Sequence, residues 1–208
     1  MLRQTVLFSG YDASGIQGLW ETNGTAAGTE EVAGISGAAP TGLVPQDLTG
    51  FDGEVLFNGT DTSGNQGLWI TNGATAGTHE LTGINGAAAS LDPSSMLVFN
   101  GAVLFDGTDA SGIASLWVTN GLAAGTSELT GITGASFNGL FSQPTDLVLF
   151  NGEVLFAGVD VNSRQSLWVT NGTAIGTVEL TGISGAFSSL EPSDMTVFNN
   201  EVLFDGLD

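Results

Sequence analysis

The chain has 208 residues, with 22 acidic residues against two arginines, no lysine, no cysteine and a formal net charge of −20. This balance excludes a generic nucleic-acid binder, which needs basic residues to displace phosphate counterions, and it disfavours docking on anionic lipid. Without cysteine there is no disulfide and no thiol chemistry. No apolar run approaches the roughly 20 residues of a membrane helix, so we predict no membrane insertion.

The amino-terminal segment, MLRQTVLFSGYD, lacks the long apolar stretch and the small-residue cleavage site of a signal peptide. An acidic, glycine-rich composition without lysine or cysteine is nevertheless typical of bacterial secreted or surface proteins. We therefore predict a secreted or cell-surface protein whose signal was removed or whose export uses another route. A cytoplasmic location is the alternative.

The chain then repeats one pattern. A VLF-x-G segment recurs with its phenylalanine at steps of 49, 48, 51 and 48 residues, namely at Phe8, Phe57, Phe105, Phe156 and Phe204. A fixed period of this size indicates a repeat architecture. We predict one repeat domain over 1–208, with repeats of about 1–53, 54–101, 102–152 and 153–200 and a closing strand at 201–208.

Residues 95–132 show the predicted elements of one unit most clearly. An apolar strand over 95–99 is followed by Asn100-Gly101, a strong hairpin signal because both turn positions favour positive φ. A second strand (102–107), a loop rich in Asp, Ser and Gly, a third strand (116–119) and a fourth over 125–132 complete the unit.

Frequent glycine penalises helix throughout, so we predict an all-β fold in which each unit is a four-stranded antiparallel meander. A meander of roughly 48 residues has the size of a propeller blade. Four units predict a four-bladed β-propeller, but the VLF strand occurs five times. The surplus copy closes the ring within the chain, is displaced, or is exchanged between subunits, and we predict a homodimer.

The Leu-Trp-x-Thr-Asn-Gly segment of each repeat carries a family resemblance. The four copies, LWETNGTAAGT, LWITNGATAGT, LWVTNGLAAGT and LWVTNGTAIGT, resemble the bacterial repeat family with the consensus Glu-Leu-Trp-x-x-Asp-Gly-Thr. The resemblance implies a propeller-like fold in a secreted or surface protein and assigns no chemistry. Gly or Ser replaces the consensus Glu, and Asn replaces the consensus Asp. The architecture is also similar to that of propeller lectins.

One tryptophan per repeat is the first candidate for ligand binding, because an indole face stacks on the apolar face of a sugar ring. These residues are Trp20, Trp69, Trp117 and Trp168. The alternative is that tryptophan at a fixed strand position packs the blade core, and that alternative is favoured.

Each repeat also places one aspartate after its VLF strand and one asparagine after its tryptophan strand. The aspartates, Asp12, Asp61, Asp109 and Asp160, either accept sugar hydroxyls or cap their own loops. The asparagines, Asn23, Asn72, Asn120 and Asn171, either bind ligand or serve turn geometry. A single acid in each loop supports calcium only weakly, because calcium takes six to eight oxygen ligands, and we predict no cofactor. The glutamates of the fourth strand, Glu31, Glu80, Glu128 and Glu179, are interpreted as a solvated face.

These patterns favour a non-enzymatic carbohydrate-binding protein that uses the tryptophan, aspartate and asparagine of each repeat to bind a glycan or polysaccharide. Avidity would strengthen such repeated weak sites. The alternative is a structural or adhesive surface module without a small ligand. With one histidine and no cysteine or lysine, nucleophilic triads and zinc sites are nearly excluded, although a carboxylate pair of the glycosidase type stays open.

Overall fold

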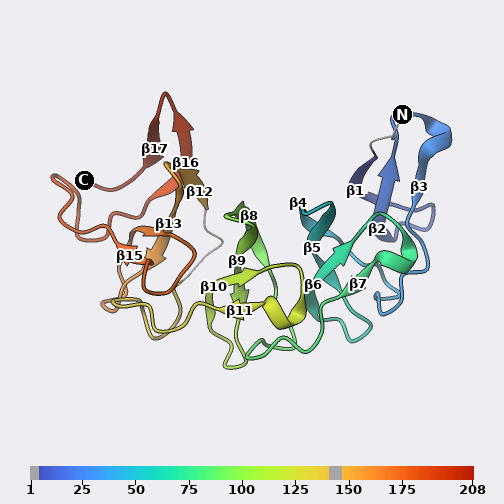
Figure 1. The fold of residues 1–208 in the computed structure, drawn as a ribbon, viewed down its shortest axis with the longest axis horizontal. Helices are drawn as coiled ribbons and strands as arrows, with labels where there is room; N and C mark the ends of the chain where they lie inside the picture. The colour runs from blue at the N-terminus through green and yellow to red at the C-terminus, as the bar shows by residue number, and fades with distance from the viewer. Residues whose placement is uncertain (1–4, 141–146) are drawn as a thin grey trace.

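The protein is an arc of small antiparallel β-sheets in the computed structural model, which describes residues 5–140 and 147–208 (Figure 1). Within these ranges there are seventeen strands, three short 3₁₀ turns and five sheets. The predicted all-β fold of antiparallel meanders is therefore confirmed. None of the helical segments in the described ranges has the length and apolar character needed to span a membrane.

Three complete sheets have the predicted four strands in chain order. The second sheet holds β4 (Gln46–Phe51), β5 (Glu54–Thr60), β6 (Gln66–Thr71) and β7 (His79–Glu80). The third holds β8 (Ser94–Phe99), β9 (Ala102–Thr108), β10 (Ala114–Thr119) and β11 (Ser127–Glu128). The fourth holds β12 (Val148–Phe150), β13 (Glu153–Val159), β14 (Gln165–Thr170) and β15 (Val178–Glu179).

The two end sheets are incomplete among the described residues. The first sheet holds β1 (Val6–Tyr11), β2 (Gln17–Thr22) and β3 (Thr29–Glu31), without an inner strand before β1. The last holds only β16 (Ser193–Phe198) and β17 (Glu201–Asp205). The two outermost copies of the VLF strand, β1 and β17, lie in different sheets at opposite ends of the arc, so the described chain does not form a closed four-bladed ring (Figure 1).

Asn-Gly and Asp-Gly turns join the first and second strands of the three complete sheets, as the sequence predicts. Both turn residues have positive φ in each case: 50° and 83° at Asp52-Gly53, 49° and 75° at Asn100-Gly101, and 52° and 80° at Asn151-Gly152. Asparagine, aspartate and glycine adopt these angles at low cost, and the resulting twist matches that of paired strands. The repeat boundaries chosen from the sequence fall in these turns, so each sheet takes its first strand from the preceding repeat.

The fourth strand is shorter than predicted. Only two residues pair in β7, β11 and β15, and three pair in β3. In the first three repeats a 3₁₀ turn precedes this strand, namely η1 (Ala26–Gly28), η2 (Thr75–Gly77) and η3 (Ala123–Gly125). The threonine that begins the Thr-Asn-Gly run bonds through its hydroxyl to the threonine after the 3₁₀ turn, as at Thr119 and Thr126 (2.7 Å), and this bond spans the turn.

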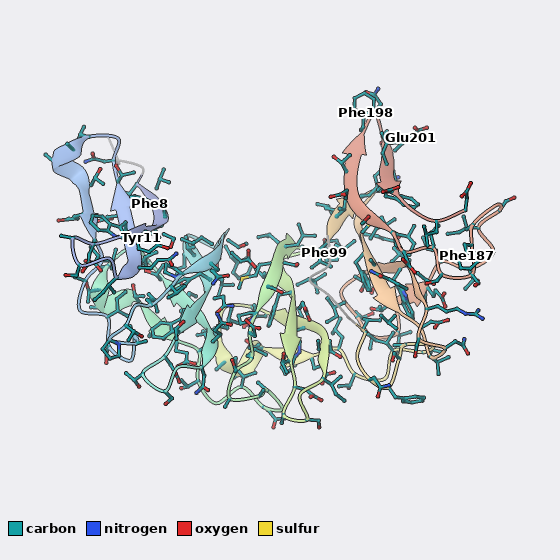
Figure 2. The ribbon with its side chains drawn as sticks, turned by 180° about the vertical axis from the view of Figure 1, so that it is seen from behind. Phe8, Tyr11, Phe99, Phe187, Phe198 and Glu201 are labelled. Atoms are coloured by element: carbon teal, nitrogen blue, oxygen red, sulfur yellow. The ribbon has the colours of Figure 1, made fainter. Side chains whose placement is uncertain are left out.

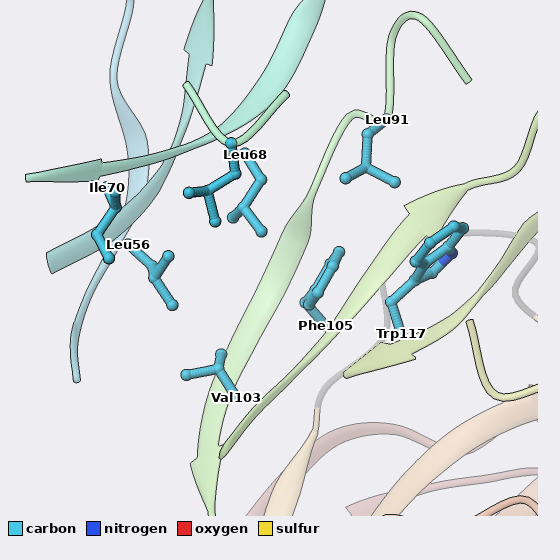
Figure 3. Close-up of a cluster of buried hydrophobic side chains, with 8 residues drawn as sticks. Leu56, Leu68, Ile70, Leu91, Val103, Phe105 and Trp117 are labelled. Carbon is cyan, nitrogen blue, oxygen red and sulfur yellow. The ribbon is translucent and has the colours of Figure 1, made fainter. Parts of the chain in front are cut away.

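Neighbouring sheets pack through two kinds of face. The leucine face carries the leucines of the second and third strands, such as Leu56 and Leu68. The tryptophan face carries the phenylalanine and tryptophan of the same strands, such as Phe105 and Trp117. The leucine face of the second sheet meets the tryptophan face of the third, and Figure 3 shows this seam. The same pairing builds the seams on either side of it.

Glycine after the VLF segment lets the tryptophan lie flat on its own sheet. A Cβ added to Gly107 would lie 2.9 Å from Leu91 and 3.0 Å from both Phe105 and Trp117. Such distances force packed side chains to move. The corresponding Gly59 and Gly158 are equally crowded.

We expect Gly107→Ala to lower the free energy of unfolding by about 1–3 kcal/mol, which is the usual cost of overpacking a core. Urea denaturation at equilibrium measures it. Gly50→Ala is the control, because Gly50 also lies in a strand and an added Cβ there meets no atom within 4 Å. Equal effects of the two substitutions would contradict the packing role of Gly107.

Candidate functional site

Three of the four candidate tryptophans lie in the core. Trp69, Trp117 and Trp168 have no exposed surface. Each lies against the phenylalanine of its own sheet with ring centroids 6.3 to 6.4 Å apart. The indole nitrogen of Trp117 donates to the carbonyl of Gly107 at 2.9 Å. No sugar ring can stack on these three side chains as they lie, so the predicted stacking role is corrected to packing. Trp20, in the first sheet, is partly exposed.

The four candidate aspartates cap their own loops, which is the alternative that the sequence offered. Asp109 accepts backbone N–H groups of Ser111 and Ile113, both at 2.8 Å. The same pair of bonds forms at Asp12, Asp61 and Asp160. Hydrogen bonds from Asn65 and Ser63 keep the pKa of Asp61 below its ordinary value, although burial opposes them. One oxygen of each carboxylate is therefore committed to the loop.

The four candidate asparagines hold the turn at the other end of the third strand. The side-chain oxygen of Asn171 accepts from the backbone and the hydroxyl of Thr173, at 3.1 and 2.7 Å. Asn23 makes the same two bonds, and Asn72 and Asn120 make the backbone bond. The aspartate precedes the third strand and the asparagine follows it, with the whole strand between them. The predicted site that combines the aspartate and asparagine of one repeat is therefore corrected, because the two lie at opposite strand ends.

A different set of residues forms a recurring pocket in the described part of the chain. Four pockets of about 230 to 370 Å³ occur, one in each repeat, and equivalent residues line them. Each has a Gly or Ser at the start of the third strand, a glutamate from the fourth strand, and an isoleucine and an alanine from the following segment. In the second repeat these are Gly67, Glu80, Ile84 and Ala87.

The glutamates of these pockets are the residues interpreted from sequence as a solvated face. Each is the cross-strand partner of the repeat's tryptophan, as Glu128 is of Trp117. The carboxylate of Glu80 lies directly over Gly67, where a Cβ would collide with it. Burial raises the pKa of Glu80, and the negative charge of Asp61 raises it further. Glu31, Glu80, Glu128 and Glu179 thus line hollows and do not stand free in water.

The pockets share a frame but differ at their rims. Asp61 and Asn65 line the pocket of the second repeat, and Asp109 lines that of the third. The third pocket adds Phe137, and the fourth adds Arg164 and Phe187. Asp12 and Asp160 are not among the lining residues of the corresponding pockets. The frame is therefore repeated, while charge and aromatic content differ from one pocket to the next.

A larger hollow of about 600 Å³ lies along the inner strands β4, β8, β12 and β16. Asp47, Ser95 and Asp194 line it at equivalent positions, each with a φ between 52° and 54° beside a register shift. The backbone N–H of Ser95 donates to the carboxylate of Asp47 at 3.1 Å. Asp47 therefore links the second sheet to the third. Among the described residues, no group of three or more Asp, Glu or His side chains is placed to hold a metal ion.

No protein-family model matches the chain, and a comparison with curated proteins finds no match. Among solved structures, it is similar to a mutant of puromycin hydrolase complexed with PGG, with a TM-score of 0.55 and 13% identity over 97% of this chain and 31% of that one. It is also similar to the tricorn protease, with a TM-score of 0.46 and 14% identity over 97% of this chain and 19% of that one. The chain thus spans about a third of the length of the first structure. At this identity the first likeness concerns the fold alone, and it agrees with a propeller-like succession of sheets.

Proposed function

We propose that the protein is a non-enzymatic, multivalent carbohydrate-binding protein with one sugar site per repeat. The observation that carries the proposal is the recurrence of one pocket frame four times in the described chain. A repeated concave site suits repeated ligands, whereas catalysis uses one special arrangement of residues.

The chemistry of each pocket suits a sugar. A glutamate offers oxygens that accept hydroxyl hydrogens, and the neighbouring isoleucine and alanine offer an apolar wall for ring C–H groups. Pockets of this size admit one or two sugar rings and not a folded partner. The binding residues are therefore Glu31, Glu80, Glu128 and Glu179, aided by Asp61 and Asp109 in the two central repeats. The tryptophans and asparagines support this frame from the core and the turns.

The proposal also covers the family, the overall architecture and the location of the protein, which the sequence indicates. The Leu-Trp-x-Thr-Asn-Gly repeats favour membership of the Glu-Leu-Trp-x-x-Asp-Gly-Thr repeat family, a propeller-like ring and a secreted or cell-surface location. A displayed glycan or polysaccharide is the target that repeated weak sites suit best, since linked sites gain avidity without any new contact.

A glycan array with labelled protein tests the proposal, and titration calorimetry then measures the affinity for the best monosaccharide. We expect binding to one coherent set of related glycans. A variant with Gln in place of Glu31, Glu80, Glu128 and Glu179 is expected to bind at least about tenfold more weakly, which corresponds to about 1.4 kcal/mol.

Glu30→Gln is the control, because Glu30 is exposed on the same outer strand as Glu31 and outside the pocket. Circular dichroism checks that each variant is folded. A blank array would overturn sugar binding and favour the structural or adhesive module. Loss of binding in chelator would instead assign the sites to calcium.

A further inference from the structure

The two end sheets present the two opposite halves of an internal seam. Three of the four seams among the described residues join a leucine face to the tryptophan face of the next sheet, and at the fourth seam Val202 and Phe204 of the last sheet take the place of that face. Among the described residues, no further sheet covers the leucine face of the last sheet, and none covers the tryptophan face of the first sheet. Figure 2 shows Phe8 and Phe198 at the two ends of the arc, with Phe99 between them.

The leucine face of the last sheet is uncovered at positions that are buried elsewhere. Phe198 is 58% exposed and Leu203 is 49% exposed, whereas their equivalents Phe99 and Leu104 are 5% and 1% exposed. The strand register confirms the equivalence: Leu203 pairs with Thr196 in the way that Leu104 pairs with Leu97, each as the third cross-strand pair from the turn. The same residue types are thus buried in one sheet and open in the other.

The tryptophan face of the first sheet is uncovered in the same way. Val6 is 59% exposed, whereas its equivalents Val103 and Val154 have no exposed surface. Phe8 and Trp20 pack on each other with centroids 6.4 Å apart, as in the other sheets, yet both keep exposed surface.

One contact fixes how such faces meet. The phenylalanine at the end of the first strand of one sheet packs on a glycine of the next sheet. This glycine belongs to the Thr-Asn-Gly run that follows the third strand of that next sheet. A Cβ added to Gly172 would lie 3.5 Å from the ring of Phe99, and a Cβ added to Gly121 would lie 3.7 Å from the ring of Phe51. The equivalent glycine of the first sheet, Gly24, has no such neighbour within 4 Å, and Phe198 has no such glycine.

We propose that the leucine face of the last sheet binds the tryptophan face of the first sheet in a second copy of this chain, with Phe198 over Gly24. The occupant is a second copy because its first sheet supplies the face that follows a leucine face at the internal seams. This contact joins two different surfaces, so it is heterologous and extends head to tail into a ring or a row. The inference goes beyond sugar binding and does not depend on it.

Charge opposes this contact and gives it a salt dependence. Two copies each carry a formal charge of −20, and Glu201 and Asp205 flank Leu203 on the exposed strand. Salt screens such repulsion, since the Debye length falls from about 10 Å at 0.1 M to about 3 Å at 1 M. Association is therefore expected to strengthen as salt is added.

Sedimentation velocity over a wide range of protein concentration tests the proposal on the whole chain. We expect the parent to associate as its concentration rises. Phe198→Glu and Val6→Glu, one on each free face, are each expected to weaken association at least tenfold. Ile175→Glu is the matched control, because Ile175 is 96% exposed in the outer turn of the fourth sheet and lies on neither face.

Mixing the two interface variants separates head-to-tail contact from a symmetric one. Phe198→Glu retains an intact first sheet and Val6→Glu an intact last sheet, so their equimolar mixture is expected to form a dimer with one seam.

A parent that stays monomeric at every concentration would overturn the proposal, and so would association that only one of the two variants weakens. A monomeric parent whose melting temperature falls in both variants would instead show that the arc closes within one chain. Sugar binding by monomeric variants is expected to persist, which keeps this test separate from that of the proposed function.

Discussion

Replacing Trp117 by alanine is expected to lower the free energy of unfolding by about 3–5 kcal/mol, the range seen for large aromatic side chains removed from cores. Trp117 has no exposed surface and lies against Phe105. It belongs to the cluster that joins the second and third sheets. Its removal empties the seam and leaves the carbonyl of Gly107 without its indole donor. Equilibrium denaturation in urea, followed by circular dichroism, measures the loss.

Trp20→Ala is the matched control for Trp117→Ala. Trp20 occupies the same strand position in the first sheet, but it is partly exposed and its indole nitrogen has no hydrogen-bond partner in the described structure. Its loss is therefore expected to cost less than half as much. Equal losses at the two positions would contradict the distinction between covered and uncovered tryptophan faces. Trp117→Ala that remains folded is expected to bind sugar as the parent does, because Trp117 lines no pocket described here.

Local features of the fold follow from the sequence because short-range chemistry decides them. Positive φ at both turn residues follows from Asn100-Gly101, whose residue types tolerate it. The strand over 102–107 follows from its β-branched and aromatic content, and the structure extends it only to Thr108. The repeat makes each such prediction several times over, which is why the meander could be predicted without any structure.

The pockets could not be predicted in this way, because their walls come from segments that meet only after packing. In the sequence, Glu80 is one of several regularly spaced polar residues. No local feature of the sequence indicates that its strand is only two residues long or that the Glu80 carboxylate lies over Gly67. A signal did exist: the glutamate follows the tryptophan by 11 residues in every repeat. Closure of the arc is also a tertiary property, since small rotations between neighbouring sheets decide whether an arc closes.

The residue type at the position of Asp106 differs among the repeats, and the acid in the third repeat has a strong electrostatic effect. The equivalent residues are Ser9, Asn58, Ala157 and Asp205, so the fold does not require an acid there. One carboxylate oxygen of Asp106 is buried without a hydrogen-bond partner in the described structure. Burial, reinforced by the negative charge of Asp92, raises the pKa of Asp106 to about 7 from an ordinary value of 3.8.

Asp106→Asn is therefore expected to stabilise the protein at pH 8 and to have little effect at pH 4. Because the folded chain holds the proton more tightly than the unfolded chain, the parent loses stability as pH rises from about 4 to about 7, and the loss is constant above that. A shift of about 3 pH units corresponds to about 4 kcal/mol, which is an upper limit, so a gain of about 2–4 kcal/mol is expected at pH 8. Urea denaturation of both proteins across this range measures the difference.

Asp205→Asn is the control, because Asp205 is exposed at the equivalent position of the last sheet and its substitution should give no such trend. A difference that stays constant with pH would show that Asp106 is ionised throughout, and that water or a neighbouring group stabilises its charge in the folded protein.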